Sequence, residues 1–182
     1  MDMRLARGER SRARLKEAFL ELVANKEPEE ISVVEVCEKA ELNRSTFYAH
    51  YDYLDKLIRD VIWGQVEKLL AAFSKQWELP LEHGGVDKTY ISLYIDRFLN
   101  DSTLIRLCGC ANHAKYRTLL IRAHIELAIG ETNDSARYYA AYCHNAGVLN
   151  LLVEWINNGF PIPKEAVVDI IHESSKVMYQ SR

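Results

Sequence analysis

Four residues that could bind a nucleic acid share one face of a helix predicted over residues 44–50: Arg44, Ser45, Tyr48 and Ala49. At 100° per residue they point away from Phe47 and Tyr51, which face the apolar side. An arginine can form two hydrogen bonds to guanine, a serine hydroxyl can bind a base or a phosphate, and a small alanine admits a thymine methyl group. This face favours contact with double-stranded DNA over its plainer alternative, a solvated polar surface.

Polar residues around this face could hold the DNA backbone. Thr46 and His50 flank the face, and Asn43 is typical of the residue that caps a helix at its N-terminus. Ser32 begins the preceding helix and Lys56 lies near the start of the following one, so both could contact phosphates. Together with the four residues above, these five complete the predicted DNA-binding set.

Three short helices must position this set. The first follows apolar residues at helical spacing from Ser11 onward and ends at residues 26–28, Lys-Glu-Pro. The second begins after Ser32, with Glu35 three residues later as in a capping box. A tight turn at residues 41–43 leads to the third. A short helix, a turn and a second short helix are typical of a helix-turn-helix, whose second helix enters the major groove.

Residues 31–57 resemble the TetR family of bacterial transcriptional regulators. The most specific part is the run Ser-Thr-Phe-Tyr-Ala-His-Tyr at 45–51, followed by Asp-Lys-Leu at 55–57. Two positions differ from the usual family pattern. Glu41 stands where a glycine is frequent, so it would need a left-handed conformation. Tyr51 stands where phenylalanine is more frequent, a mild change if its hydroxyl finds a partner.

The resemblance implies an all-α homodimer that regulates transcription. An N-terminal three-helix head with the helix-turn-helix would occupy residues 1–53. A larger C-terminal helical domain, residues 54–182, would dimerise through a four-helix bundle and bind a small-molecule inducer. Members of this family are usually repressors that bind a near-palindromic operator and leave it when a ligand binds. The implied contacts are to phosphates for Tyr48, His50 and Lys56, and to bases for Arg44 and Ser45.

The charge is unevenly distributed along the chain. Residues 1–16 hold six basic side chains against two acidic ones, whereas the whole chain carries a net charge of −3. A basic arm on an acidic body can approach a polyanion locally. The arm is expected either to contact a phosphate or the minor groove, or to remain an unstructured tail.

The rest of the chain has helical patterns separated by breaks. A long helix is predicted over residues 54–77, and residues 78–87, with one proline and a Gly-Gly pair, form the clearest linker. The last two predicted helices resemble the end of one type of TetR C-terminal domain. They carry more apolar residues than one core face needs. The additional residues indicate a second apolar face that packs against the same helices of another copy around a two-fold axis. Helices after the linker are predicted at 88–99, 102–110, 112–129, 134–157 and 164–179.

Several residues of this half are candidates for a ligand pocket, although aromatic residues at helical spacing are more often simple core. The candidates are Trp63, Tyr94, Phe98, His113, Tyr116, Tyr139 and Cys143. Cys108 and Cys110 with His113 raise the question of a metal, but Cys-x-Cys with one histidine lacks the paired spacing of a structural zinc site. Buried thiols are the better explanation, and no metal or cofactor is predicted.

Composition and motifs exclude other classes of protein. Of the 182 residues 48% are hydrophobic, enough for a real core, and eight glycines with four prolines are too few for many strands and hairpins. No nucleophile elbow, phosphate loop or metalloprotease motif occurs, so an enzyme is not expected. No stretch is apolar enough to cross a membrane, and a cytoplasmic location is expected.

Two alternatives to an operator-binding regulator stay open. One is a protein of the same fold that serves as a small-molecule sensor or protein-interaction module without operator binding. The other is a helical enzyme that uses the cysteine, histidine and tyrosine residues of the C-terminal half.

Overall fold

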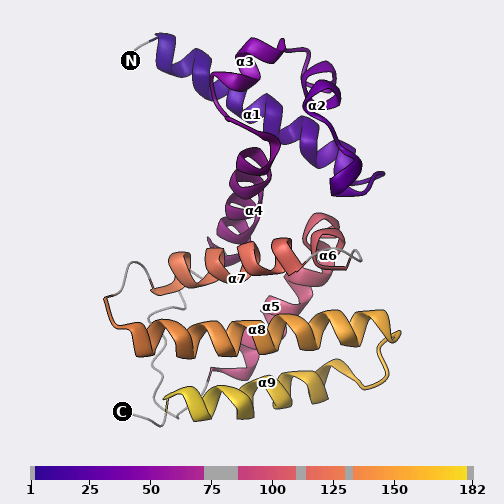
Figure 1. Cartoon of the computed structure of the whole chain (residues 1–182). Helices are drawn as coiled ribbons and strands as arrows, with labels where there is room; N and C mark the ends of the chain where they lie inside the picture. Colours follow the sequence, from indigo (N-terminus) through magenta and orange to yellow (C-terminus); the bar gives the residue numbers. More distant parts are fainter. Residues whose placement is uncertain (1–2, 72–85, 110–113, 130–132, 180–182) are drawn as a thin grey trace. The chain divides into compact units, whose positions relative to one another are not determined.

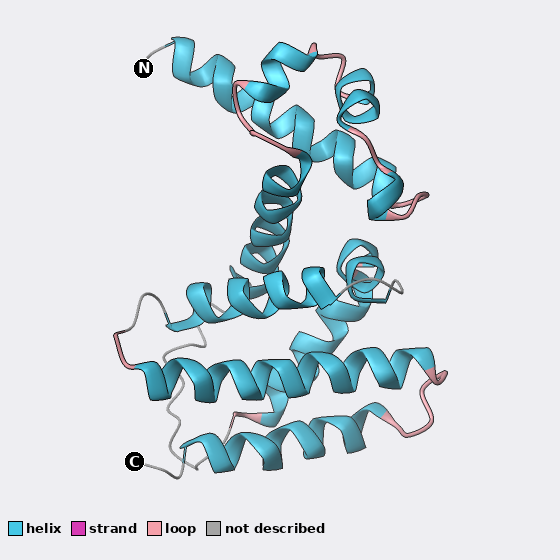
Figure 2. Cartoon of the chain, in the orientation of Figure 1, coloured by secondary structure: helices cyan, strands magenta, loops and turns pink. Residues whose placement is uncertain are grey.

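The computed structural model describes residues 3–71, 86–109, 114–129 and 133–179 of the chain. Every regular element in these residues is helical, as predicted, and Figure 2 shows helices joined by loops. The chain divides into two compact units, residues 1–64 and 65–182. We call the first unit the head and the second the C-terminal unit.

The head contains three helices, one turn of 3₁₀ helix and the first part of a fourth helix. Helix α2 packs against both α1 and α3. The side chains that fill the centre of the head are almost wholly buried: Leu15, Phe19, Val36, Phe47, Leu57 and Ile62. The elements are α1 (Met3–Val23), η1 (Pro28–Glu30), α2 (Val33–Lys39), α3 (Arg44–Tyr48) and α4 (Leu54–Ala71).

The predicted capping box is present at the start of α2. The Ser32 hydroxyl accepts a hydrogen bond from the Glu35 backbone N–H, and the Glu35 carboxylate accepts one from the Ser32 backbone N–H. Two N–H groups that a helix start leaves without an intrahelical partner are satisfied in this way. The box gives a seven-residue helix a defined beginning.

The turn between α2 and α3 has the conformation that its sequence predicts. Glu41 adopts a φ of 49°, in the left-handed region that favours glycine. Its backbone N–H donates to Glu38 O at 3.0 Å, and its carboxylate accepts a hydrogen bond from Arg14 of α1 at 2.9 Å. The turn therefore keeps its shape with a glutamate that also contacts the first helix.

The head extends further along the chain than residue 53, where the sequence places its end. The compact unit ends at Gly64, inside α4. The reason is that Leu57, Ile58 and Val61 in the first part of α4 are each buried to at least 97%. These residues contribute to the head's apolar centre.

In the described residues of the C-terminal unit, five helices follow the second part of α4. Helix α8 lies between α7 and α9, and α5 also packs against α9 (Figure 1). Where the structure describes them, the observed helices begin and end within two residues of the predicted bounds. Residues 72–77 of the predicted long helix lie outside the described residues. The helices are α5 (Lys88–Asn100), α6 (Ser102–Gly109), α7 (Ala114–Ile129), α8 (Ser135–Asn157) and α9 (Lys164–Tyr179).

A sharp turn ends α8, where the sequence predicts a stop. Gly159 and Phe160 have φ values of 68° and 62°, so two consecutive residues are left-handed. The Trp155 indole N–H donates to Ile162 O at 2.8 Å, and the Phe160 ring packs edge-on against Trp155 at 4.8 Å between centroids. The aromatic pair fixes the turn that leads into α9.

No helix among the described residues is both long enough and apolar enough to span a membrane.

Candidate nucleic-acid interface

The outward face of α3 is composed as the helical spacing predicts. Arg44, Ser45 and Ala49 are exposed, and Tyr48 keeps 56% of its surface accessible. Phe47 is fully buried and packs edge-on against the Tyr48 ring, with the centroids 5.4 Å apart. The buried ring anchors α3 in the head, so the other side chains are left to face outward.

Asn43 organises the start of α3 through one oxygen atom. Its Oδ1 accepts a hydrogen bond from the Thr46 backbone N–H at 2.8 Å, as expected of an N-cap. The same oxygen lies 2.7 Å from Ser45 Oγ and 2.7 Å from Thr46 Oγ1, and accepts from both hydroxyls. Asn43 thus positions the two hydroxyls that the sequence places at the interface.

Two of the expected phosphate-contacting residues border this face. His50 is half-buried, and its ring lies beside Gly8 of α1, where an added Cβ would be 3.7 Å from His50 Cε1. Lys56 is exposed near the start of α4, and its ammonium lies 5.8 Å from the centre of the Tyr53 ring. Both residues belong to the head: His50 follows α3 in the chain, and Lys56 lies in the first turn of α4.

Ser32 has a more local role than the sequence suggests. Its hydroxyl donates to the Glu35 carboxylate at 2.7 Å. Hydrogen bonds from Lys26 and Ser32 lower the pKa of Glu35 from 4.5 to about 2, so this carboxylate stays charged beside Ser32. The Ser32 hydroxyl already donates its proton to Glu35, so a DNA phosphate would have to compete with this carboxylate for the hydrogen bond.

Tyr53 is an interface candidate that the sequence reasoning missed. It lies in the loop before α4, beside Lys56, and 52% of its surface is exposed. A tyrosine with a free polar tip next to a lysine is well suited to a phosphate. The available signal was its place near Lys56, in a short loop directly after the predicted helix-turn-helix.

A polar network ties three segments of the head together. Tyr51 is 5% exposed, and its hydroxyl donates to Asp60 Oδ2 of α4 at 2.6 Å. Arg12 of α1 donates to the same carboxylate oxygen at 2.8 Å and to the Tyr51 hydroxyl at 3.2 Å. The Tyr51 hydroxyl thus has the partner that makes tyrosine a mild change from the phenylalanine of the family pattern.

The charge state of Asp60 follows from this network. Burial raises the pKa of the carboxyl, but hydrogen bonds from Tyr51 and Arg12 outweigh burial, so the net pKa is below the usual value. Burial and the hydrogen bond to Asp60 raise the pKa of Tyr51. A carboxylate and a neutral phenol therefore hold Arg12 in place.

The basic N-terminal segment is not the unstructured tail of the alternative prediction, because α1 begins at Met3 and includes it. Arginine, leucine and alanine, frequent in this segment, are good helix formers. Arg12 and Lys16 face Asp60 at 2.8 and 3.7 Å, and Arg14 pairs with Glu41 at 2.9 Å. Arg12, Arg14 and Lys16 thus contact carboxylates of the head itself.

Two of the expected ligand-pocket residues lie together in the C-terminal unit. Tyr94 and Phe98 of α5 have nearly parallel rings, 6.4 Å apart. The Tyr94 hydroxyl donates to His124 Nε2 at 2.6 Å, and His124 Nδ1 donates to Leu120 O at 2.8 Å. Burial lowers the pKa of His124 and raises that of Tyr94, so both side chains are neutral.

The other five expected pocket residues are spread over the chain. Tyr116 of α7 is 3% exposed, whereas Tyr139 of α8 is 69% exposed and Cys143 is also exposed. Trp63 belongs to the head, where the Arg59 guanidinium lies 4.6 Å from its ring centre. His113 lies outside the described residues.

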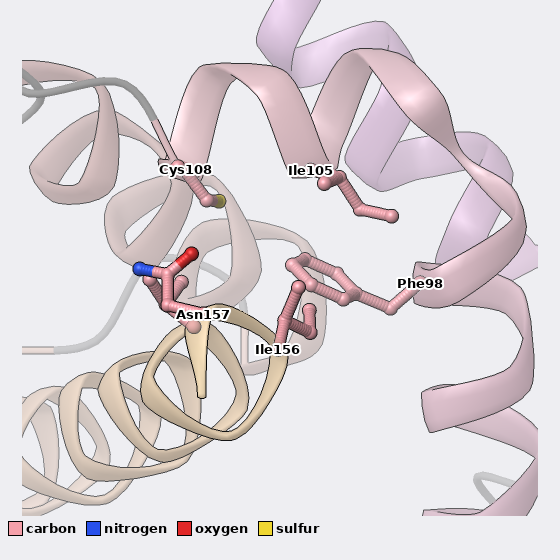
Figure 3. Close-up of a pocket in the computed structure, with 7 residues that line it drawn as sticks. Phe98, Ile105, Cys108, Ile156 and Asn157 are labelled. Carbon is pink, nitrogen blue, oxygen red and sulfur yellow. The ribbon is translucent and has the colours of Figure 1, made fainter. Parts of the chain in front are cut away.

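Two hollows lie among the described residues of the C-terminal unit. The hollow beside Phe98, Ile105, Cys108 and Ile156 (Figure 3) has a volume of about 10 Å³, close to the room that one water needs. A larger hollow of about 730 Å³ near Lys68 is open to solvent. Pockets for drug-sized ligands enclose roughly 300–1,000 Å³.

Only Cys108 of the cysteine and histidine group lies within the described residues. Cys108 is buried at the end of α6, where its carbonyl oxygen accepts a hydrogen bond from Arg117 at 3.0 Å. Cys110 and His113 lie outside the described residues. Within the part of the chain that the structure describes, no three cysteine, histidine or acidic residues gather as a metal site would need.

Comparison with known proteins identifies the fold. No protein-family model matches the sequence. No curated protein matches it either. Among solved structures, the crystal structure of a TetR transcriptional regulator from Rhodococcus sp. RHA1 is similar, with a TM-score of 0.59. The similarity covers 95% of this chain and 98% of that protein at 16% sequence identity. The chain thus has the fold of a TetR transcriptional regulator.

Proposed function

We propose that this TetR-type fold is a sequence-specific DNA-binding transcriptional regulator rather than an enzyme. The observation that carries the proposal is the outward face of α3, where Arg44, Ser45 and Tyr48 are exposed on the second helix of a helix-turn-helix. A short helix anchored by a buried ring and presenting such side chains suits the major groove.

Each residue of the predicted set has a proposed role in DNA recognition. Arg44 forms two hydrogen bonds with a guanine, and Ala49 allows the backbone of α3 to approach the bases. Tyr48, His50 and Lys56 contact phosphates, with Tyr53 beside them. Ser45 contacts a base beside Arg44. The remaining members of the set act at helix starts or at the rim of the interface: Ser32, Asn43 and Thr46.

The regulator acts as a homodimer on a near-palindromic operator. Supporting this, α8 and α9 pack against each other, and Ile170 of α9 is 46% exposed. Two copies of this helix pair would form a four-helix bundle around a two-fold axis. The two heads would then occupy successive major grooves, about 34 Å apart.

A small molecule that binds the C-terminal unit releases the protein from its operator, so the protein is a repressor. The candidate binding region is around Tyr94, Phe98 and Tyr116, because these aromatic residues are concentrated in the buried part of the C-terminal unit. The hollow beside Phe98 has a volume of only about 10 Å³, so a ligand that enters there must select a more open conformation. It acts as an inducer only if it binds the DNA-incompetent state more tightly.

Anisotropy measurements on labelled duplexes test the proposal. The duplexes carry the DNA that flanks the coding region, and shuffled duplexes serve as controls. Arg44→Ala and Tyr48→Ala should each weaken specific binding by about tenfold or more. The matched variant Arg122→Ala, at an exposed position on α7, should bind as the wild type does.

The salt dependence supplies a second criterion. Specific binding should weaken steeply as the salt concentration rises, because phosphate contacts release counterions. Equal and weak binding of every protein to every duplex would reject the proposal and favour a sensor or interaction module without operator binding.

A further inference from the structure

We infer that Ser45 acts as a hydrogen-bond acceptor in the DNA interface, and so selects adenine or cytosine, whose amino groups are the donors of the major groove. The inference rests on the proposed function and adds a base class to one position of the operator. It follows from the way Asn43 engages the hydroxyl groups at the start of α3.

The direction of these hydrogen bonds is fixed by chemistry. The atom of Asn43 that caps α3 accepts the Thr46 backbone N–H at 2.8 Å, so it is the amide oxygen Oδ1 and not the nitrogen. Ser45 Oγ and Thr46 Oγ1 each lie 2.7 Å from this oxygen. Because the amide oxygen carries no hydrogen, each hydroxyl must be the donor of its own bond.

The outward side of the Ser45 hydroxyl therefore carries lone pairs. A hydroxyl has one proton and two lone pairs, and the proton is directed at Asn43. Ser45 itself is exposed on α3, beside Arg44. What it presents to a ligand is an acceptor.

The four bases differ in whether they present a hydrogen-bond donor to an acceptor in the major groove. Adenine N6 and cytosine N4 are donors there, whereas guanine presents N7 and O6 and thymine presents O4, all of which are acceptors. Ser45 thus stabilises adenine or cytosine and repels guanine or thymine at the base it meets. The Arg44 guanidinium has only donors and therefore favours the acceptors of guanine, whereas Ser45 favours the donors of adenine or cytosine.

The same geometry limits contacts with the backbone. Phosphate oxygens are acceptors, and the Thr46 hydroxyl donates its proton to Asn43, as that of Ser45 does. Neither hydroxyl donates to a phosphate while the cap is intact. The hydrogen bonds and ion pairs to phosphates come from Tyr48, His50 and Lys56 instead, and Thr46 lies at the rim without donating.

The test begins with selection of an operator from random duplex DNA by the full-length wild-type protein. Each adenine and cytosine of the selected half-site is then replaced by an analogue that lacks the major-groove amino group, purine for adenine and 2-pyrimidinone for cytosine. Wild type and Ser45→Ala are compared on the same duplexes, so any weakening of the base pair itself cancels. Ser102→Ala, an exposed serine of α6, is the matched control.

At one position the analogue should lower wild-type and Ser102→Ala affinity by about three- to tenfold and leave Ser45→Ala unchanged. Asn43→Gly keeps the cap position favourable for a helix start but frees both hydroxyls. In that variant the preference for the amino-bearing base at the same position should shrink, since Ser45 can then donate to guanine or thymine.

The possible failures are distinguishable. If the wild type binds a selected operator but no adenine or cytosine shows an effect that depends on Ser45, the acceptor role is wrong and the DNA-binding function stands. A preference that is unchanged in Asn43→Gly also overturns the acceptor role. If no sequence is enriched at all, both this inference and the proposed function fail.

Discussion

Helices α2 and α3 of the head have seven and five residues, whereas α7, α8 and α9 of the C-terminal unit have 16, 23 and 16. Isolated helices shorter than about 12 residues are marginal in water. The short pair therefore depends on caps and on anchoring rings, and the long helices depend on apolar packing along their length. The dependence on caps explains why the head has a recognisable sequence signature.

The polar contacts of the two units differ in a similar way. In the head, Arg12 and Asp60 are 48 residues apart and meet at a partly exposed carboxylate. In the C-terminal unit, Tyr94 and His124 form a neutral hydrogen-bonded pair in a buried environment. Charged contacts link distant segments in both units, since Lys164 of α9 also pairs with Asp96 of α5 at 2.8 Å, whereas the neutral pair of Tyr94 and His124 lies inside the C-terminal unit.

The largest expected effect comes from removing one buried ring in each unit. Phe47→Ala and Phe98→Ala each delete a fully buried side chain, and each should cost about 3–5 kcal/mol of stability. Hydrogen exchange resolved along the chain should show loss of protection confined to the head for Phe47→Ala, and to the C-terminal unit for Phe98→Ala. Equal loss in both units for either variant would contradict the separation into two units.

The next effect concerns the polar network of the head. Tyr51→Phe removes a hydroxyl that bonds to Asp60 and Arg12, and should cost about 1–2 kcal/mol in denaturant unfolding. Tyr53→Phe removes an exposed hydroxyl and should change stability by less than about 0.5 kcal/mol. A Tyr51→Phe protein as stable as the control would mean that the network contributes nothing to the head.

A smaller effect compares helix caps in the two units. Asn43 caps the five-residue α3, and Asp87 caps the 13-residue α5 through the Tyr90 N–H at 3.0 Å. Asn43→Ala should cost about 1 kcal/mol, and Asp87→Ala about half as much, because packing holds α5. Thermal unfolding of the two variants measures this difference. A larger loss of stability in Asp87→Ala than in Asn43→Ala would contradict the idea that short helices depend more on their caps.

The last prediction concerns the pH at which each unit begins to weaken. Burial lowers the pKa of His124 below its ordinary value of 6.5, so the stability that the neutral imidazole contributes is present above pH 6.5 and is lost as the pH falls below it. The pKa of Glu35 is lowered from 4.5 to about 2, so its contribution to the head is lost only between those values.

Hydrogen exchange from pH 7.5 downward should therefore show the C-terminal unit losing protection before the head does. His124→Gln should reduce the loss that begins near pH 6.5. His144, whose pKa is also lowered by burial, supplies the companion variant His144→Gln, which separates the two histidines. Earlier loss in the head would show that other groups control its response to acid.

Local features of the head were predictable from the sequence because they depend on neighbouring residues. The capping box needs only Ser32 and Glu35 in register, and the left-handed Glu41 was expected because it stands where the TetR pattern often has a glycine. The inward position of Phe47 follows from helical spacing alone. These features involve residues within a few positions of one another.

Features that depend on folding or on side-chain rotation were not predictable. The contact of Arg12 with Asp60 joins residues from α1 and α4, and spacing carries no information about it. The bond from Ser45 to Asn43 depends on the rotation of a hydroxyl. The closing of the space near Phe98 depends on how side chains from three helices, α5, α6 and α8, fill it.

The tryptophan residues give each unit a natural fluorophore. Trp63 lies in the head under the Arg59 guanidinium, and Trp155 is 6% exposed in the C-terminal unit, where its indole N–H is bound to Ile162 O. In a Trp77→Phe background, Trp155→Phe leaves an emission signal from the head, and Trp63→Phe leaves one from the C-terminal unit. Unlabelled protein can then report which unit responds first to DNA, to a small molecule or to acid.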